Sequence, residues 1–245
     1  MLSLDPEVPA APQPVPRLSS PYWRFYDAVA AEQLLAWLPE HPVCVLDLSG
    51  DGPSRAKLMR DAGHDVVRVG SGTINGVRSV VADIRSLRWL ADSCVDAVVA
   101  ESRALSMSLA AEDTARDVSR VLRPGGRLLL VVDSLTTGLA RLADQGRWAE
   151  LADVPFADVV LVPDEDGTIT RCFWPEELQA LLEDSGFDVE WVRPRSVLSP
   201  TAVERAIATG GDEALRALVK TELTLAVDRE GETNGIHLVA SARKP

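Results

Sequence analysis

The chain has 245 residues, of which 46% are hydrophobic and only 5% aromatic, and this predicts one large α/β domain rather than two small ones. Twenty-five Lys and Arg against 37 Asp and Glu give a net charge of −12, which argues against nucleic acid or anionic lipid as a partner. Because the sequence has neither a run of 18 apolar residues nor a basic segment followed by an apolar one, we expect no membrane span and no export.

The cysteines number three and lie in apolar or strand-like surroundings, at Cys44, Cys94 and Cys172. An odd number argues against a disulfide framework, and the spacing matches no zinc pattern. We therefore expect a cytoplasmic protein without a metal site.

The first 21 residues contain six prolines, which remove backbone donors and favour extended conformations. We predict a disordered leader over residues 1–19 and a single domain over 20–245. Proline pairs at PxxP spacing, such as Pro6 and Pro9, leave a partner-binding role open, but such spacing arises easily in any proline-rich segment.

An amphipathic helix with an aromatic face is predicted over residues 22–38, ending before Pro39. After it, short β-branched runs alternate with helical segments, which indicates a parallel sheet that is buried on both faces. The predicted strands are 43–48, 65–69, 79–82, 95–100 and 127–132, and the helical segments are 54–62, 85–91 and 111–122.

The second half of the chain differs, because residues 137–175 are predicted to insert a helix (138–151) and a hairpin (158–162 with 168–173). The sequence predicts both ends of the helix that follows, since Pro175 suits its first turn and Gly186 suits its C-terminal end. The remaining predicted elements are a strand at 189–192, helices at 201–208 and 213–226, and a closing strand at 236–242.

The first strand and its turn read VCVLDLSGDGPSR (43–55), a glycine-containing loop before a helix N-terminus, where a backbone can approach a ligand closely. A nicotinamide-type fingerprint requires a third glycine where Arg55 stands, and a Walker-type loop requires Gly-Lys-Ser/Thr, which is absent. What remains is an acidic residue, Asp47, immediately before a loop of small residues.

Over about residues 22–245 the chain resembles the class I S-adenosylmethionine-dependent methyltransferases. The matching stretches are VLDLSGDGPSR (45–55), VVADIRSL (80–87), VDAVVAES (95–102), SRVLRPGGRLLLVV (119–132), FWPEELQALLEDSGFDVEWV (173–192) and GIHLVASARKP (235–245). The resemblance implies a doubly wound, seven-stranded, mostly parallel Rossmann-like sheet with an antiparallel last strand.

The same resemblance implies S-adenosyl-L-methionine as cofactor and assigns its contacts. Asp83 is the expected partner of the adenine amino group, and Ile84 is expected to pack near the ring. Tyr26, with Tyr22 and Trp23, could cover the sulfonium by cation–π contact, although a packed amphipathic helix explains these aromatic residues equally well. The predicted cofactor-binding residues are Tyr26, Asp47, Ser49, Gly50, Asp51, Gly52, Gly70, Asp83, Ile84 and Glu101.

The sequence departs from the family pattern at two places. Gly50 and Gly52 are displaced by one position from the usual glycines, and Gly70 ends the second strand where an acidic residue normally accepts both ribose hydroxyls. Loss of that two-pronged, charge-assisted contact would weaken binding by about 1.5–3 kcal/mol, or roughly ten- to a hundred-fold. Ser71 or Asn75 could substitute in part, and a decayed cofactor site is the alternative.

Methyl transfer demands mainly that the acceptor approach the methyl group in line with the departing sulfur, with a base only where the acceptor loses a proton. Glu101, after the fourth strand, is the predicted base. Ser102 is a second candidate, and Arg103 is a candidate anchor for an acidic acceptor. His64 and His237 are predicted to be structural.

The sequence therefore predicts a methyltransferase that acts on an unidentified small molecule, with 137–175 forming part of the acceptor site and the oligomeric state left open. The alternative is a catalytically inactive methyltransferase-fold protein that serves as a binding or interaction module. A nicotinamide-dependent oxidoreductase is the third possibility.

Overall fold

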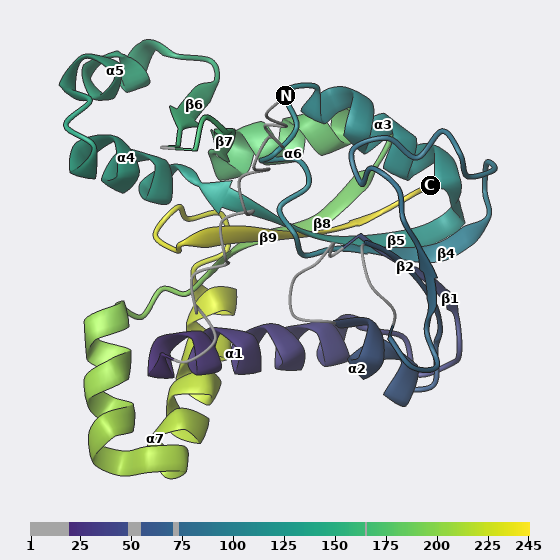
Figure 1. Cartoon of the computed structure of the whole chain (residues 1–245), viewed down its shortest axis with the longest axis horizontal. Coiled ribbons are helices and arrows are strands. Elements are labelled where there is room, and N and C mark those ends of the chain that lie inside the picture. The colour runs from purple at the N-terminus through teal and green to yellow at the C-terminus, as the bar shows by residue number, and fades with distance from the viewer. Residues whose placement is uncertain (1–19, 49–54, 71–73, 165) are drawn as a thin grey trace, which may run out of the picture.

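The computed structural model describes residues 20–48, 55–70, 74–164 and 166–245, in which helices cover both faces of one mixed sheet (Figure 1). The predicted leader, 1–19, lies outside these residues. So do four predicted cofactor contacts, Ser49, Gly50, Asp51 and Gly52, and the proposed ribose substitute Ser71.

Parallel strands form the centre of the sheet, in the order β3-β2-β1-β4-β5. The last strand is antiparallel and pairs with both β5 and β8, as predicted. The bounds of these strands are β1 (Cys44–Asp47), β2 (Asp65–Val69), β3 (Arg78–Val80), β4 (Val95–Ala100), β5 (Leu122–Ser134), β8 (Asp188–Arg195) and β9 (His237–Arg243). The doubly wound α/β fold class predicted from the sequence is thus confirmed.

The predicted strand count of seven is wrong, because the sheet has nine strands among the described residues. The two additional strands are the hairpin of β6 (Val160–Pro163) and β7 (Ile169–Phe173). The hairpin was expected but not counted in the sheet, which it joins because β7 pairs with the last two residues of β5, Asp133 and Ser134.

The first helix, α1 (Pro21–Trp37), begins where the side chain of Ser20 accepts from the N–H of Trp23 and Pro21 occupies the first turn. With α2 (Arg55–Asp61) it covers one face of the sheet, and α3 (Ala111–Val121) and α6 (Pro175–Asp184) cover the other (Figure 1). Phe25, Val29 and Leu34 are fully buried.

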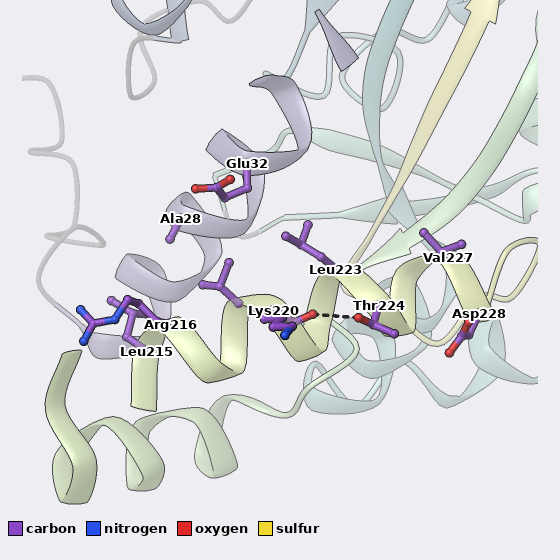
Figure 2. Close-up of a pocket in the computed structure, with 10 residues that line it drawn as sticks. Ala28, Glu32, Leu215, Arg216, Lys220, Leu223, Thr224, Val227 and Asp228 are labelled. Atoms are coloured by element: carbon purple, nitrogen blue, oxygen red, sulfur yellow. Dashed lines mark hydrogen bonds between the residues drawn. The ribbon is translucent and has the colours of Figure 1, made fainter. Parts of the chain in front are cut away.

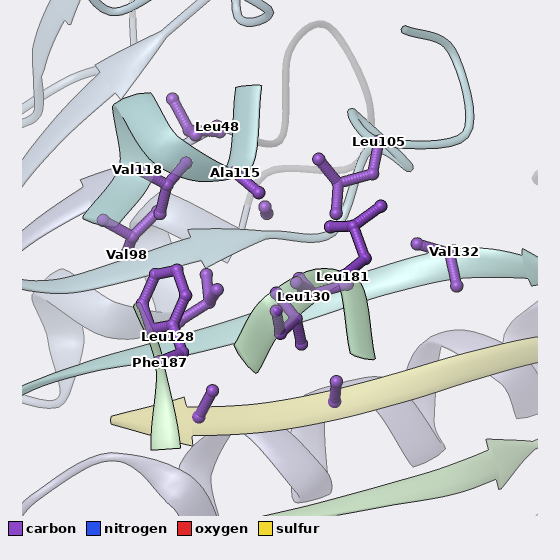
Figure 3. Close-up of a cluster of buried hydrophobic side chains, with 14 of the residues drawn as sticks. Leu48, Val98, Leu105, Ala115, Val118, Leu128, Leu130, Val132, Leu181 and Phe187 are labelled. Atoms are coloured by element: carbon purple, nitrogen blue, oxygen red, sulfur yellow. The ribbon is translucent and has the colours of Figure 1, made fainter. Parts of the chain in front are cut away.

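Alternate residues of a buried strand serve opposite core layers. In β4, Val98 packs with α3 and α6 residues in the cluster shown in Figure 3, whereas Val99 packs on the α1–α2 side with Leu34 and Met59. Because both faces are covered, the central strands read as continuous apolar runs.

Four predicted helical segments, 85–91, 138–151, 201–208 and 213–226, differ in the structure. Residues 85–91 form turns instead of a helix, since the Asp83 carboxylate and the Asp117 carboxylate take up the backbone N–H groups of Arg85 and Leu87. Gly146, at φ +67°, divides the predicted helix 138–151 into α4 (Leu135–Asp144) and α5 (Trp148–Asp153), which the short turn η2 (Val154–Phe156) follows.

The two predicted helices at 201–208 and 213–226 are continuous in α7 (Pro200–Asp228), with a sharp kink at Gly211. Gly211 has φ +55° and ψ −140°, a conformation that glycine adopts without steric penalty. The kink turns the second half of α7 back toward the sheet, and it crosses and contacts α1 on the way (Figure 1).

Candidate functional site

The carboxyl ends of β1, β4 and β5 meet at one edge of the sheet, where the strand order reverses between β1 and β4. In open α/β sheets this switch point is the usual ligand crevice. Asp47, Glu101 and Asp133 lie at these three strand ends. Because β8 and β9 are antiparallel to each other, the end of β8 at Arg195 and the start of β9 at His237 reach the same edge.

Glu101 lies between two arginines in what we call the Glu101 cluster: Glu101, Arg55 and Arg195. Its carboxylate oxygens lie 2.8 Å from Arg55 Nε and 2.9 Å from an Arg195 terminal nitrogen. The Glu101 and Arg195 side chains are only 6% and 1% exposed. Burial alone would raise the pKa of Glu101, but the two guanidinium groups outweigh it and hold that pKa below its usual value.

The low pKa keeps Glu101 ionised and makes it a weaker base than a free carboxylate. Its assignment as the catalytic base stays a prediction. The geometry itself shows a carboxylate whose two oxygens each accept from a buried cation.

Helix α1 contributes further partners to this cluster. Arg55, the residue that stands in place of a third loop glycine, also pairs with Asp27 at 3.0 Å. Arg195 Nε donates to Gln33 Oε1 at 2.6 Å, and the Arg195 guanidinium lies 5.6 Å from the centroid of the Tyr26 ring. The cluster therefore joins α1 and α2 to the ends of β4 and β8.

A second chain of contacts runs beside the first, and we call Tyr26, His237 and Asp133 the His237 chain. The Tyr26 hydroxyl lies 3.0 Å from His237 Nδ1, and His237 Nε2 lies 3.4 Å from Asp133 Oδ1. Arg103 donates to both Asp133 oxygens at 2.9 Å. Arg103, the predicted anchor for an acidic acceptor, is thus paired with Asp133 within the protein. Its own backbone has φ +60°.

Of the three aromatic residues proposed as a cover, Tyr26 faces the carboxyl edge. Tyr22 is buried in the cluster between α1 and α7, and Trp23 packs at its border and edge-on against Tyr26. Ser102 donates from Oγ to the Leu48 carbonyl at 2.6 Å.

Asp47 and Gly70 both lie at the expected strand ends. Asp47 is fully buried and stands in register with Arg68 of β2 and Val99 of β4. Gly70 follows β2 and donates its N–H to the Val80 carbonyl at 3.0 Å. Gly70 therefore offers only backbone groups at the position where the family pattern has a carboxylate side chain.

Asp83, the expected adenine partner, follows β3 and is half-exposed with its carboxylate engaged by one residue. Arg85 donates to it from the backbone N–H and from the guanidinium, at 2.9 to 3.0 Å. These hydrogen bonds lower the pKa of Asp83. Ile84 is partly buried against the main core cluster.

Several residues at this edge escaped the sequence prediction, namely Arg195, Gln33 and Asp133. The sequence does show an arginine at the end of a strand-like stretch (VRPR, 192–195) and an acidic residue at the end of an apolar run (LLLVVD, 128–133). His237 was noticed but expected to be structural, and only the register of β9 against β5 places it opposite Asp133.

A pocket of about 690 Å³ lies elsewhere, between α1 and the second half of α7 (Figure 2). Its lining, which includes Glu32, Leu223 and Val227, shares no residue with the Glu101 cluster or the His237 chain. Within residues 20–48, 55–70, 74–164 and 166–245, no three His, Cys, Asp or Glu side chains gather as a metal site would require. Nor does any helix in those ranges have the length and apolarity to cross a membrane.

Residues 29–130 match the family model of a methyltransferase domain. No curated relative matches the chain in sequence. Many solved structures match its fold, and none of those below exceeds 20% identity, so they bear on fold alone.

A structure of an S-adenosylmethionine-dependent methyltransferase from Mesorhizobium loti is 18% identical, with a TM-score of 0.55, over 92% of this chain and 99% of that one. The 1,6-didemethyltoxoflavin-N1-methyltransferase of Burkholderia thailandensis, solved with 1,6-didemethyltoxoflavin and S-adenosylhomocysteine, is 16% identical, with a TM-score of 0.52, over 96% and 92%. The [4+2]-cyclase SpnF is 20% identical, with a TM-score of 0.52, over 91% and 81%.

The strand order, the antiparallel β9 and the matched domain agree with one another. Residues 29–130 match a methyltransferase domain, and the chain shares the fold of solved S-adenosylmethionine-dependent methyltransferases.

Proposed function

We propose that the protein transfers a methyl group from S-adenosyl-L-methionine to a small-molecule acceptor at the carboxyl edge of β4 and β5. The observation that carries the proposal is the Glu101 cluster, three ionised side chains buried at the switch point of the sheet. Buried ion pairs cost desolvation energy that apolar packing would avoid, so their concentration in a ligand crevice favours a functional role.

The residues at this edge fit the cofactor at its methionine end. S-adenosyl-L-methionine supplies an electrophilic methyl group on a cationic sulfur, together with an ammonium and a carboxylate. Glu101 and Asp47 offer negative charge for the cationic groups, and Arg55 offers a guanidinium for the carboxylate. The Tyr26 ring adds an aromatic face near the sulfonium position implied by the resemblance.

The fit is weaker at the ribose and the adenine. Gly70 provides no carboxylate for the ribose hydroxyls, and the Asp83 carboxylate is already hydrogen-bonded to Arg85. We therefore expect an affinity at the weak end of the family's range, and a gain of roughly ten-fold when Gly70 is replaced by Asp, from one restored charge-assisted contact.

A small-molecule acceptor is supported by the surroundings of the site. The insertion of α4, α5, β6 and β7 follows β5 directly and extends beyond that end of the sheet (Figure 1). It exposes the large apolar side chains of Trp148 and Phe156. The net charge of −12 argues against a nucleic-acid acceptor.

The alternative function is a protein of this fold that binds a ligand without methylating it. The cyclase SpnF among the structural neighbours has this fold and is named for another reaction. Gly70 and the Asp83–Arg85 pair favour this alternative, because both weaken the adenosine end of the expected cofactor site.

Titration calorimetry with S-adenosylmethionine and S-adenosylhomocysteine separates the two functions. Binding that strengthens in Gly70→Asp and weakens in Asp83→Ala supports the proposed methyltransferase, and Asp166→Ala, on an exposed turn, serves as the control. No heat with either ligand at millimolar concentration, in both the wild type and Gly70→Asp, would refute it.

A further inference from the structure

His237 is held on both sides of its ring at the carboxyl edge of the sheet. Tyr26 contacts Nδ1 at 3.0 Å from α1, and Asp133 contacts Nε2 at 3.4 Å from β5. Tyr26, Asp133 and His237 are far apart in the sequence and meet only in the folded chain. The pairing of β9 with β5 places His237 opposite Asp133.

The donors and acceptors in this chain can be ordered from their chemistry. Asp133 is ionised, because its pKa is lowered: burial opposes this, but His237 and Arg103 outweigh it. An ionised carboxylate only accepts, so the proton on the ring is on Nε2. Nδ1 is then an acceptor, and the Tyr26 hydroxyl donates to it.

The uncharged His237 ring has one nitrogen, Nδ1, that carries no proton. Burial lowers its pKa below the usual 6.5, so the ring is neutral at pH 7. The charged and titratable groups that face this chain come from five elements and the segment after β4: Tyr26 (α1), Arg55 (α2), Glu101 and Arg103 (after β4), Asp133 (β5), Arg195 (β8) and His237 (β9).

Tyr26 is the member of the His237 chain whose ring lies against the Glu101 cluster. Asp133 and His237 are buried at 1% and 8% exposure, whereas Tyr26 is only partly buried and lies over the Arg195 guanidinium of the Glu101 cluster.

We propose that Tyr26, His237 and Asp133 form a proton relay that deprotonates the hydroxyl of a phenol or enol acceptor during methyl transfer. This inference rests on the proposed function. The acceptor oxygen forms a bond to the methyl carbon as the carbon–sulfur bond breaks, and the electron pair of that bond goes to sulfur. The acceptor proton passes to the Tyr26 oxygen while the Tyr26 proton passes to His237 Nδ1, which leaves an imidazolium beside the Asp133 carboxylate.

The relay narrows the class of acceptor. A hydroxyl must lose its proton as the new bond forms, and a base in hydrogen-bond reach lowers that barrier. A thioether or a tertiary amine carries no proton to lose and would gain nothing from the relay. The Glu101 carboxylate, paired with two guanidinium groups, is less suited to the same task.

The first test uses the protein alone and needs no acceptor. The chain contains only three histidines and two tyrosines, so the imidazole resonances can be assigned by substitution. Nitrogen-15 NMR of the imidazoles is expected to show His237 as the Nε2–H tautomer, titrating below pH 6.5. Tyr26→Phe should shift the Nδ1 resonance and Asp133→Asn should alter the tautomer ratio, while Tyr22→Phe, the matched control, leaves both unchanged. A wild-type Nδ1–H tautomer, or a His237 spectrum unaffected by Tyr26→Phe, would overturn the relay.

The second test measures S-adenosylhomocysteine release with catechol and simple phenols as probe acceptors. Tyr26→Phe and His237→Gln are expected to lower kcat by about 10²-fold or more, the usual worth of a positioned base. Affinity for S-adenosylhomocysteine should change less than two-fold, and the acid limb of the wild-type pH profile, which protonation of His237 would set, should be lost. His64→Gln, at a buried histidine outside the site, is the control.

The two proposals fail in different ways. Absence of cofactor binding by calorimetry counts against methyl transfer whatever the NMR result. Cofactor binding with turnover of phenols that is equal in wild type, Tyr26→Phe and His237→Gln overturns the relay alone. Methylation of amine or thioether probes in preference to every phenol also overturns it.

Discussion

Replacing Glu101 by Gln removes the charge from the Glu101 cluster while preserving its shape. The amide offers one oxygen where the carboxylate offers two, and it turns an NH₂ group toward one of the two guanidinium groups. Arg55 retains Asp27 at 3.0 Å and Arg195 retains Gln33 at 2.6 Å, so neither cation loses every partner.

The expected loss follows from burial. Removing one partner of a buried ion pair costs about 3–5 kcal/mol, and the remaining contacts of both arginines place Glu101→Gln near the lower end, at about 3 kcal/mol. For a chain of this size, that corresponds to a fall of roughly 6–12 °C in melting temperature. The free energy of unfolding is obtained from urea titration followed by circular dichroism, provided that the transition is two-state.

The matched control is Glu112→Gln, which removes a carboxylate that also contacts a buried arginine. Glu112 is 51% exposed, and its partner Arg171 keeps a second carboxylate, Glu177, so the loss should stay below about 1 kcal/mol. The folded-state pKa of Glu101 is lowered from 4.5, so its contribution is present above that pH and is lost as pH falls. The difference in free energy of unfolding between wild type and Glu101→Gln should therefore narrow below pH 4.5. Equal losses in the two variants at pH 7 would refute the reasoning.

Three further predictions concern other parts of the fold. Gly126→Ala should cost about 1–3 kcal/mol in urea titration, because a Cβ there would lie 2.8 Å from the backbone oxygen of Arg123, and an unchanged midpoint would contradict this. The pKa of His237 is lowered from 6.5, so neutral His237 favours folding above that pH and the benefit is lost on acidification. The free energy of unfolding should then fall more steeply from pH 7 to 5 in wild type than in His237→Gln. Parallel plots of this free energy against pH would contradict the prediction. Burial raises the pKa of Cys172 to about 12, so Ellman's reagent at pH 8 should modify the half-buried Cys94 but spare Cys172 until urea is added.

The order of elements was predictable because local patterns determined it. Strands 65–69 and 95–100 match β2 and β4 to the residue, since polar or turn-forming residues flank each apolar run. The helix predicted over 85–91 was wrong, because the carboxylates of Asp83 and Asp117 accept from backbone N–H groups of this segment. Asp117 is remote in sequence, so its contact could not be predicted from the local pattern. The membership of β7 in the sheet was equally out of reach, because it depends on pairing with the end of β5.

The candidate site was predictable only where a residue ends a parallel strand. Asp47 and Glu101 follow from that rule, and the structure places both at the switch point. Arg195 and His237 lie on strands that reach this edge through the antiparallel pairing of β8 with β9. No local pattern states that pairing, so their contacts with Glu101, Tyr26 and Asp133 required the folded structure.

The Glu101 cluster is therefore where stability and function can be separated by experiment. Apolar side chains of similar volume often replace a buried ion pair without loss, so Glu101→Leu combined with Arg195→Met should recover at least half of the stability lost in Glu101→Gln. The double variant removes the negative charge next to Arg55 and the cation beneath Tyr26, so its affinity for S-adenosylhomocysteine should fall by more than ten-fold. Recovered stability with unchanged affinity would mean that the cluster only joins α1 to the sheet. Recovered stability with lost affinity would mean that the fold retains these buried charges for their ligand.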